Sequence, residues 1–149
     1  PFGMMVEVPS TAVLIDELIE EIDFISIGTN DLIQYTLAVE RNNEKVADFY
    51  QPLNPAILKL IQMIARAGKK HGKTVSVCGE MAGDPLYTQL LLGLGVDQLS
   101  MHPAAIPLTK HILLQSNVNM LDELAGKVFS FKTVKELRSY LAGQLQHIL

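Results

Sequence analysis

Short apolar runs alternate with longer amphipathic stretches through the first 115 residues of the chain. Four of these runs are about four residues long and end at polar or turn-forming residues, which is typical of buried strands. We expect the strands at residues 4–6, 24–27, 74–77 and 98–101. Each is followed by apolar positions that recur with a period near 3.6, which predicts a helix. Four successive strand–helix units indicate a parallel sheet covered by helices.

Capping residues mark where the helices begin. The first helix is predicted to start at Ser10 and to continue to Ile22 without a break. A long polar connection through residues 41–43 then leads to a helix start at Asn54, where Pro55 occupies the first helical position. Further helices are expected from Asp84, over residues 106–115, around residues 121–125 and from Thr133, which fits a capping box with Glu136.

The predicted fold class is α/β, with about four βα units forming half of a TIM (βα)8 barrel. A complete barrel takes about 250 residues, so this chain of 149 residues is too short to close one. The alternative is an open doubly wound sheet, but no glycine-rich nucleotide-binding motif follows any strand. We expect residues 1–115 to form the barrel units and residues 116–149 to form terminal helices. The chain opens on Pro1 directly before strand-like sequence, which predicts a piece of a longer protein.

The charge and hydrophobicity of the chain argue against two classes of partner, nucleic acid and membrane. The 12 Lys and Arg residues are scattered among 16 Asp and Glu residues, so nucleic acid is not an expected partner. The apolar runs are much shorter than the roughly 20 residues that span a bilayer, so we expect no membrane insertion. A single cysteine and no signal-type segment at the N-terminus predict a cytoplasmic location.

Polar residues stand where the predicted strands end, and in a parallel barrel this edge is the catalytic face. Glu7 follows the first strand and Asp31 the second. A strand-end carboxylate more often caps a helix or is solvated, but two at matching positions on neighbouring strands favour a shared cation. Mg²⁺ takes one or two protein carboxylates and completes its coordination with water and phosphate oxygens. The pair therefore predicts a Mg²⁺ site.

Three further residues are candidates at the same edge. Asn30 offers an amide donor, and Arg41 offers a planar fork for phosphate, although most loop arginines are only solvated. Cys78 ends the third strand. A lone cysteine is usually an inert core residue, but a thiol at this position, protonated at neutral pH and beside the carboxylate of Glu80, suits a proton donor. His102 is a weaker candidate, and no spacing typical of a zinc site occurs.

Four segments, residues 3–7, 26–35, 41–42 and 77–84, closely resemble the enzyme I family, the phosphoenolpyruvate-protein phosphotransferases of the bacterial phosphotransferase system. The resemblance covers essentially the whole chain and implies the C-terminal half of the phosphoenolpyruvate-binding barrel. It implies that Glu7 and Asp31 bind Mg²⁺ and that Asn30, Asp31 and Arg41 hold phosphoenolpyruvate. It also implies that Cys78 protonates the enolate that becomes pyruvate.

In this family the phosphoryl group passes to a histidine of the N-terminal domain and then to a histidine phosphocarrier protein. That domain and the first half of the barrel are absent here, so the chain alone is expected to be inactive. Residues 41–43 and Pro85 tilt the resemblance slightly towards the nitrogen-related paralogue over the sugar-transport enzyme.

Three other functions stay open at this stage. The first is the barrel of a pyruvate phosphate dikinase or phosphoenolpyruvate synthase, which the sequence of the missing N-terminal region would distinguish. The second is a non-catalytic module for dimerisation and effector sensing, which predicts that Glu7, Asp31 and Cys78 do not converge. The third is an unrelated Mg²⁺-dependent lyase, which does not account for the segment around Cys78.

We expect the chain to self-associate. A half barrel exposes two sheet edges and apolar faces that the other half would cover, and such surface rarely stays bare. The family resemblance also implies a homodimer formed through this domain. Sedimentation at micromolar concentration should detect dimers or larger species, and a compact monomer would contradict the expectation.

Overall fold

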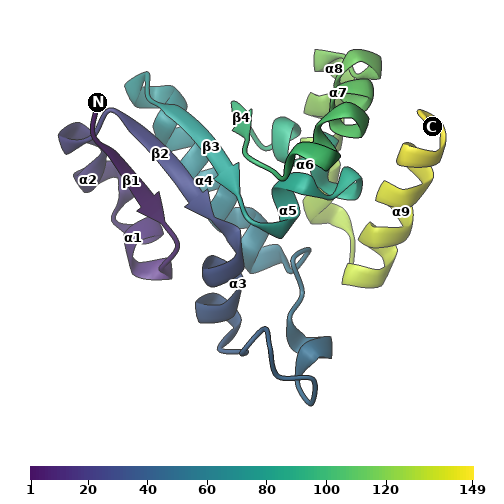
Figure 1. Ribbon diagram of the computed structural model, residues 1–149, viewed down its shortest axis with the longest axis horizontal. Helices are drawn as coiled ribbons and strands as arrows, with labels where there is room; N and C mark the ends of the chain where they lie inside the picture. The colour runs from purple at the N-terminus through teal and green to yellow at the C-terminus, as the bar shows by residue number, and fades with distance from the viewer.

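The computed structural model describes all 149 residues and contains one parallel four-stranded sheet (Figure 1). Its strands are β1 (Gly3–Val6), β2 (Phe24–Gly28), β3 (Thr74–Cys78) and β4 (Gln98–Leu99), and they lie in the order β1-β2-β3-β4. Every neighbouring pair is parallel. The predicted α/β class and parallel sheet are therefore confirmed.

Nine α-helices and four short 3-10 helices connect and follow the strands. The α-helices are α1 (Pro9–Val13), α2 (Ile15–Leu18), α3 (Thr29–Leu37), α4 (Pro55–His71), α5 (Glu80–Gly83), α6 (Pro85–Gly93), α7 (Ile106–Gln115), α8 (Val118–Lys127) and α9 (Val134–Gln146). The 3-10 helices are η1 (Ile19–Glu21), η2 (Ala47–Phe49), η3 (Pro103–Ala105) and η4 (Val128–Ser130). None of these helices is both long enough and apolar enough to cross a membrane.

Only one face of the sheet is covered by helices. Strand residues that alternate along the chain point to opposite faces, and the register aligns Ile25 with Val75 on the covered face, where both are fully buried. On the other face the register aligns Met5, Ser26 and Ser76, none of which is buried. Figure 1 shows α1 and α4 behind the strands, whose nearer face carries no helix. The apolar core consequently lies between the sheet and this helical layer.

The local signals for the long helices are confirmed. The Asn54 side chain accepts a hydrogen bond from Ala56 N at 2.9 Å, and Gly72 ends α4 in the left-handed region at φ 64°. Asp84 caps α6 through Leu86 N at 2.9 Å. Thr133 and Glu136 form the predicted capping box at the start of α9. The helix predicted over residues 106–115 is α7.

The first helix differs from the prediction. It begins at Pro9 after the extended residue Val8, so Ser10 is not its cap. Proline at the first helical position has a preset φ and lacks the N–H that would need a cap, which explains the earlier start. The helix is also broken at Leu14, which has φ −93° and ψ 19°, and continues as α2 and η1.

The polar connection after the second strand is also different. Helix α3 begins at Thr29 directly after β2, and its residues Leu32 and Ile33 are buried. Polar residues 29–31 looked like a turn because they occupy the first helical turn, where an acidic residue such as Asp31 is favoured by the helix dipole. Ala38 ends the helix in the left-handed region, at φ 53°.

The fourth strand has two residues where four were predicted. It is an edge strand with β3 as its only partner, and Pro103 begins η3 soon after it. Proline has no N–H to give to a ladder, which limits how far the strand extends.

Helix α4 lies against β3 at Gly68, and this close approach can be tested. A Cβ at Gly68 would overlap the Val75 side chain and lie 2.9 Å from the Lys73 carbonyl oxygen. Overpacking costs about 1–3 kcal/mol, which exceeds the gain of about 1 kcal/mol from replacing a helical glycine by alanine. We expect Gly68→Ala to lower the free energy of unfolding measured in urea.

Gly143→Ala is the matched control, because a Cβ there meets nothing within 4 Å. In α9 this change should raise the free energy of unfolding by about 0.5–1 kcal/mol. A shift of both variants in the same direction would contradict the close contact between α4 and β3.

Candidate active site

The carboxyl ends of β1, β2 and β3 lie at the same edge of the sheet, as the parallel register requires. Val6 pairs with Ile27, and Gly28 pairs with Cys78. The residues that directly follow the three strands are therefore neighbours. They include Glu7 and the two segments that sequence reasoning selected, residues 29–31 and 78–80.

Glu7 lies over the end of the neighbouring strand. Its Oε2 is 2.9 Å from the position that a Cβ on Gly28 would take, so only glycine leaves room for this carboxylate. Asp31 stands three residues beyond Gly28, in the first turn of α3. Both predicted metal ligands thus follow adjacent strands at one edge, and their sharing of a cation stays a prediction.

These two carboxylates fit a hard divalent cation. The structure contains no group of three or more His, Cys, Asp or Glu residues arranged to hold a metal. Mg²⁺ does not need such a group, because it commonly uses one or two carboxylates together with water and substrate phosphate oxygens. Glu7 and Asp31 are the residues at this edge that would hold it.

Cys78 ends β3 on the uncovered face of the sheet, and its side chain is partly accessible. Ser26 Oγ of β2 donates a hydrogen bond to its sulfur at 3.6 Å, and the sulfur lies 3.5 Å from the Ile27 carbonyl oxygen and 3.9 Å from Met5 Sδ of β1. Sequence reasoning missed Ser26. Its position two residues before Gly28, on the same face of β2, was the only available signal.

Two hydrogen bonds join the first turn of α3 to the turn after β3. Thr29 Oγ1, which is fully buried, donates to the Cys78 carbonyl oxygen at 2.7 Å. Asn30 Oδ1 accepts from the Glu80 N–H at 3.0 Å. Because the amide oxygen of Asn30 is engaged in this way, its NH₂ group is left to donate to an anion.

The loop between α3 and α4 carries Arg41 and is tied to α3 at two points. Arg41 N donates to Gln34 Oε1 at 3.2 Å, and the Tyr50 hydroxyl donates to the Asn30 carbonyl oxygen at 3.2 Å. The guanidinium of Arg41 makes no hydrogen bond or ion pair in the structure. The backbone of Arg41 is therefore tied to α3 at Gln34, and its side chain is exposed and available.

The pKa of Tyr50 is shifted by its surroundings in the site. The sequence analysis missed this residue because nothing in the polar loop distinguishes it. Its partial burial raises its pKa to about 12, and the carboxylates of Glu80 and Asp31 act in the same direction. The positive charge of Arg41 opposes them. Charged groups from three separate segments thus influence the pKa of one phenol.

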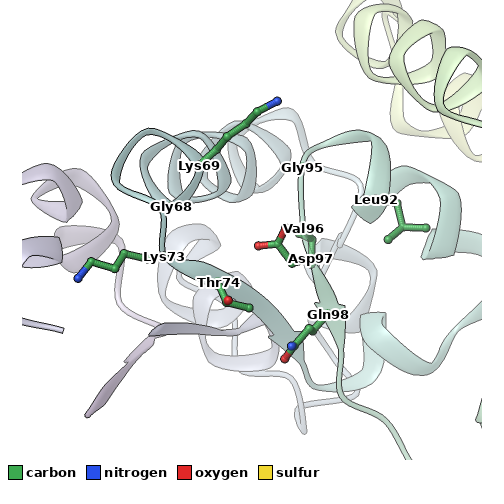
Figure 2. A pocket seen from close by; sticks show the side chains of 10 residues that line it. Gly68, Lys69, Lys73, Thr74, Leu92, Gly95, Val96, Asp97 and Gln98 are labelled. Carbon is green, nitrogen blue, oxygen red and sulfur yellow. The ribbon is translucent and has the colours of Figure 1, made fainter. Parts of the chain in front are cut away.

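A hollow in the surface lies at the opposite edge of the sheet. It has a volume of about 580 Å³ and is lined by the end of α4 and the segments leading into β3 and β4. Figure 2 shows the side chains of Lys69 and Lys73 pointing in different directions. The Asp97 carboxylate accepts a hydrogen bond from Val75 N at 2.8 Å. We assign this hollow no chemistry, because its charged groups do not converge.

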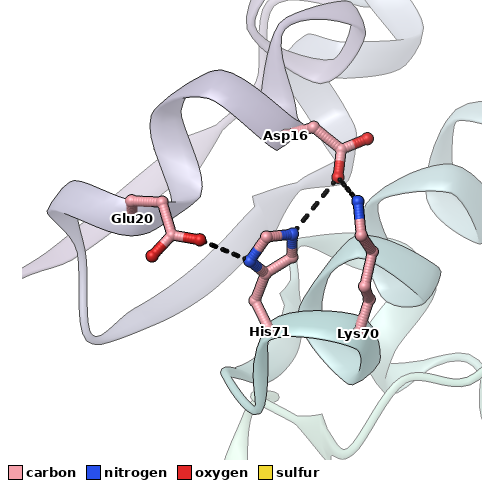
Figure 3. A network of polar contacts seen from close by, with 4 residues as sticks. All are labelled: Asp16, Glu20, Lys70 and His71. Atoms are coloured by element: carbon pink, nitrogen blue, oxygen red, sulfur yellow. Dashed lines mark hydrogen bonds and ion pairs between the residues drawn. The ribbon is translucent and has the colours of Figure 1, made fainter.

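A polar cluster also lies at the far edge, where α4 ends beside α2 and η1 (Figure 3). Lys70 Nζ is 2.9 Å from Asp16 Oδ1, and His71 Nδ1 is 2.7 Å from Glu20 Oε1. The hydrogen bond and charge of Lys70 lower the pKa of Asp16.

His102, the weaker candidate from the sequence, caps a short helix. Its Nδ1 accepts a hydrogen bond from Ala104 N at 3.3 Å, at the start of η3.

Residues 1–118 match the family model described as PEP-utilising enzyme, PEP-binding domain. The chain belongs to this family. It is 43% identical over 145 residues to the phosphoenolpyruvate-protein phosphotransferase of Buchnera aphidicola subsp. Acyrthosiphon pisum, covering 97% of this chain and 25% of that protein. It is 47% identical over 139 residues to the protein of the same name from Bacillus subtilis, covering 93% and 24%. The chain thus spans about a quarter of the length of the curated relatives it matches.

The raised pKa of Tyr50 predicts how stability depends on pH. Its phenol stays protonated in the folded chain up to about pH 12, whereas the unfolded chain ionises it near the ordinary value of 10.0. A raised pKa gives a contribution that is complete below the unfolded value and is lost as pH rises towards the folded value. We expect the free energy of unfolding in urea to fall between about pH 10 and pH 12, and to fall less in Tyr50→Phe.

Tyr140→Phe is the matched control, because Tyr140 belongs to α9 and packs against Phe131 and Lys127. This variant should lose stability with pH as the unmodified chain does. An equal loss in the two phenylalanine variants would show that Tyr50 is not the responsible group.

Proposed function

We propose that this chain is the C-terminal half of the phosphoenolpyruvate-binding barrel of a phosphoenolpyruvate-protein phosphotransferase. The observation that carries the proposal is the gathering of Glu7, the first turn of α3 and Cys78 at the carboxyl edge of one parallel sheet. These are the segments that resemble the enzyme I family. The names of the relatives support the same activity.

Half of a (βα)8 barrel accounts for the uncovered face of the sheet. A doubly wound sheet carries helices on both faces, whereas the inner face of a barrel is filled by layers of its own side chains. Met5, Ser26 and Ser76 lie on this face, and in a closed barrel their side chains would belong to such layers. An apolar hollow of about 420 Å³, lined in part by Leu99 and Leu113, lies beside the edge strand β4 and offers a surface for the next unit.

The other half of the barrel and a phosphohistidine domain are proposed to come from further sequence in the same protein. The relatives are about four times as long as this chain, which leaves room for both. In this arrangement residues 116–149 are the C-terminal helices of the barrel domain. They pack on α6 through buried residues that belong to the common core, such as Leu124, Leu137 and Leu141.

The residues of this chain divide the chemistry among them. Asn30 donates its NH₂ group, and Arg41 its guanidinium fork, to the phosphate and carboxylate oxygens of phosphoenolpyruvate. Glu7 and Asp31 hold Mg²⁺, which offsets negative charge on the phosphoryl and enolate oxygens when it is bound. Such catalysis is mainly a matter of position and charge. This kind of catalysis requires side chains in fixed positions, and here they lie on the segments that directly follow adjacent paired strands.

Cys78 completes the proposed reaction as the acid. When the bond between phosphorus and the bridging oxygen breaks, the phosphoryl group goes to a histidine of the enzyme and the enolate of pyruvate remains. The Cys78 thiol gives its proton to the methylene carbon, forming pyruvate and a thiolate that takes a proton back from water. The Ser26 hydroxyl at 3.6 Å from the sulfur is placed to stabilise this thiolate. A free thiol also supports a cytoplasmic, reducing location.

The proposed partners are phosphoenolpyruvate and pyruvate, a histidine phosphocarrier protein that meets the N-terminal domain, and a second copy of the same subunit. A dikinase or synthase barrel is the alternative for the same site, but the relatives named above carry the phosphotransferase name. A purely regulatory module would not need a carboxylate, an amide and a thiol at one edge, so we favour the catalytic function.

Replacement of Cys78 tests the proposal in the full-length gene product. We expect phosphoenolpyruvate-dependent phosphorylation of the carrier protein in the presence of Mg²⁺. Cys78→Ala should lower turnover by about 10²–10⁴-fold, the usual contribution of a general acid, while phosphoenolpyruvate binding is retained. Glu7→Gln should instead raise the Mg²⁺ concentration needed and lower the rate.

Glu17→Gln is the control for the carboxylate, since Glu17 is an exposed residue of α2. It should leave both the rate and the Mg²⁺ requirement unchanged. Unaltered turnover in Cys78→Ala, or a protein without any phosphoenolpyruvate-dependent phosphorylation, would contradict the proposed function.

A further inference from the structure

Gly79, directly after Cys78, has a backbone conformation and a packing environment that both require glycine. Its φ of 94° and ψ of −171° fall in a region that is essentially restricted to glycine. A Cβ at this position would also lie 2.7 Å from Thr29 Oγ1 and 2.8 Å from Asn30 Oδ1. The turn after β3 is thus pressed against the first turn of α3.

Hydrogen bonds hold the residues on both sides of Gly79. Thr29 Oγ1 donates to the carbonyl oxygen of Cys78 at 2.7 Å, and Asn30 Oδ1 accepts from the N–H of Glu80 at 3.0 Å. The partners are about 50 residues apart in sequence and belong to adjacent strand–helix units. We call this arrangement of Thr29, Asn30, Cys78, Gly79 and Glu80 the interstrand clamp.

The interstrand clamp joins the two groups that act on opposite ends of the substrate in the proposed reaction. One of its bonds fixes the main chain at Cys78, whose thiol is the acid. The other fixes the orientation of the Asn30 amide, so that its NH₂ group faces away from Glu80 N and is available to the anion. A displacement of either turn would move the acid relative to the anion donor.

We propose that Thr29 and Gly79 are positioning residues, which set the distance between the Cys78 thiol and the Asn30 amide without touching the substrate. This inference rests on the proposed function for its consequence in turnover, but the geometry of the clamp is independent of it. Misplacement of a reacting group by about 1 Å can cost about 10²-fold in rate, so a single buried hydroxyl is able to influence the reaction strongly.

The competing explanation is that Thr29 only stabilises the fold, as any buried and hydrogen-bonded hydroxyl does. The chain offers a matched comparison at Thr88 of α6, which is also fully buried but whose Oγ1 has no hydrogen-bond partner. Replacing threonine by valine removes a hydroxyl at nearly constant volume at either position. Only the change at Thr29 leaves a main-chain oxygen beside the thiol without its partner.

The first experiment measures the rate at which iodoacetamide alkylates Cys78, the only cysteine of the chain. We expect Thr29→Val to change this rate at least about fivefold, since thiol reactivity follows its surroundings. Thr29→Ser keeps the hydroxyl and should restore the rate to within about twofold, and Thr88→Val should stay within the same limit. Equal rates in Thr29→Val and Thr88→Val would overturn the proposal.

A second pair of variants decides the matter if Thr29→Val does not fold. Gly79→Ala and Gly95→Ala both place alanine at a positive φ, of 94° and 99°, but a Cβ at Gly95 meets only Ala65 Cβ at an ordinary 3.5 Å. Backbone strain is therefore common to the two variants. The alkylation rate should change in Gly79→Ala alone, and an equal change in both would count against the clamp.

Turnover in the full-length protein separates this inference from the proposed function. Thr29→Val should lower kcat for phosphoenolpyruvate-dependent phosphorylation by about tenfold or more, with recovery in Thr29→Ser. If the unmodified protein has no such activity, the proposed function fails while the alkylation rates still test the clamp. If it is active and Thr29→Val matches Thr88→Val in kcat, the positioning role is wrong.

Discussion

Parallel pairing of β1, β2 and β3 determines where Glu7, the first turn of α3 and Cys78 lie. The register aligns the ends of these strands, so the residue that follows each one emerges at the same edge of the sheet. Burial of Val6, Ile27 and Val77 against the helices keeps this register, because a slip of one residue would turn those side chains to the uncovered face. The apolar core therefore fixes the register of the strands, and the register determines which residues are neighbours in the site.

Close backbone approach is the second constraint, and glycine makes it possible. Gly28 leaves space for the Glu7 carboxylate, and Gly79 leaves space for Thr29 and Asn30. In both cases the side chain that approaches is polar and comes from the neighbouring unit. The site is consequently assembled from adjacent strand–helix units, and its geometry depends on how closely those units pack.

Local signals in the sequence predicted local features well. Asn54, Asp84 and Thr133 each satisfy a backbone N–H within three residues, so their capping role follows from short-range chemistry alone. The position of Glu7 and Asp31 at one edge followed from strand periodicity and the parallel class. The start of α3 was missed because polar residues in a first helical turn resemble a turn in composition.

Hydrogen bonds between residues far apart in the chain could not be predicted from the sequence. The bond from Thr29 to Cys78 and the bond from Tyr50 to Asn30 link residues 49 and 20 positions apart, and no periodicity encodes either of them. They depend on the tertiary placement of whole elements. Their partners were visible in the sequence only as ordinary polar residues, so their significance emerged when the register and the loop path were known.

The amino and carboxyl edges of the sheet differ in whether their charged side chains have partners within the chain. At the amino edge, Asp16 contacts Lys70 and Glu20 contacts His71, so these four side chains have polar partners within the chain. At the carboxyl edge, Glu7 and Arg41 have no ion-pair partner in the chain. Arg41 is exposed, so its guanidinium is accessible to an anionic ligand. This asymmetry is expected of a parallel α/β fold whose strand carboxyl ends face a charged substrate.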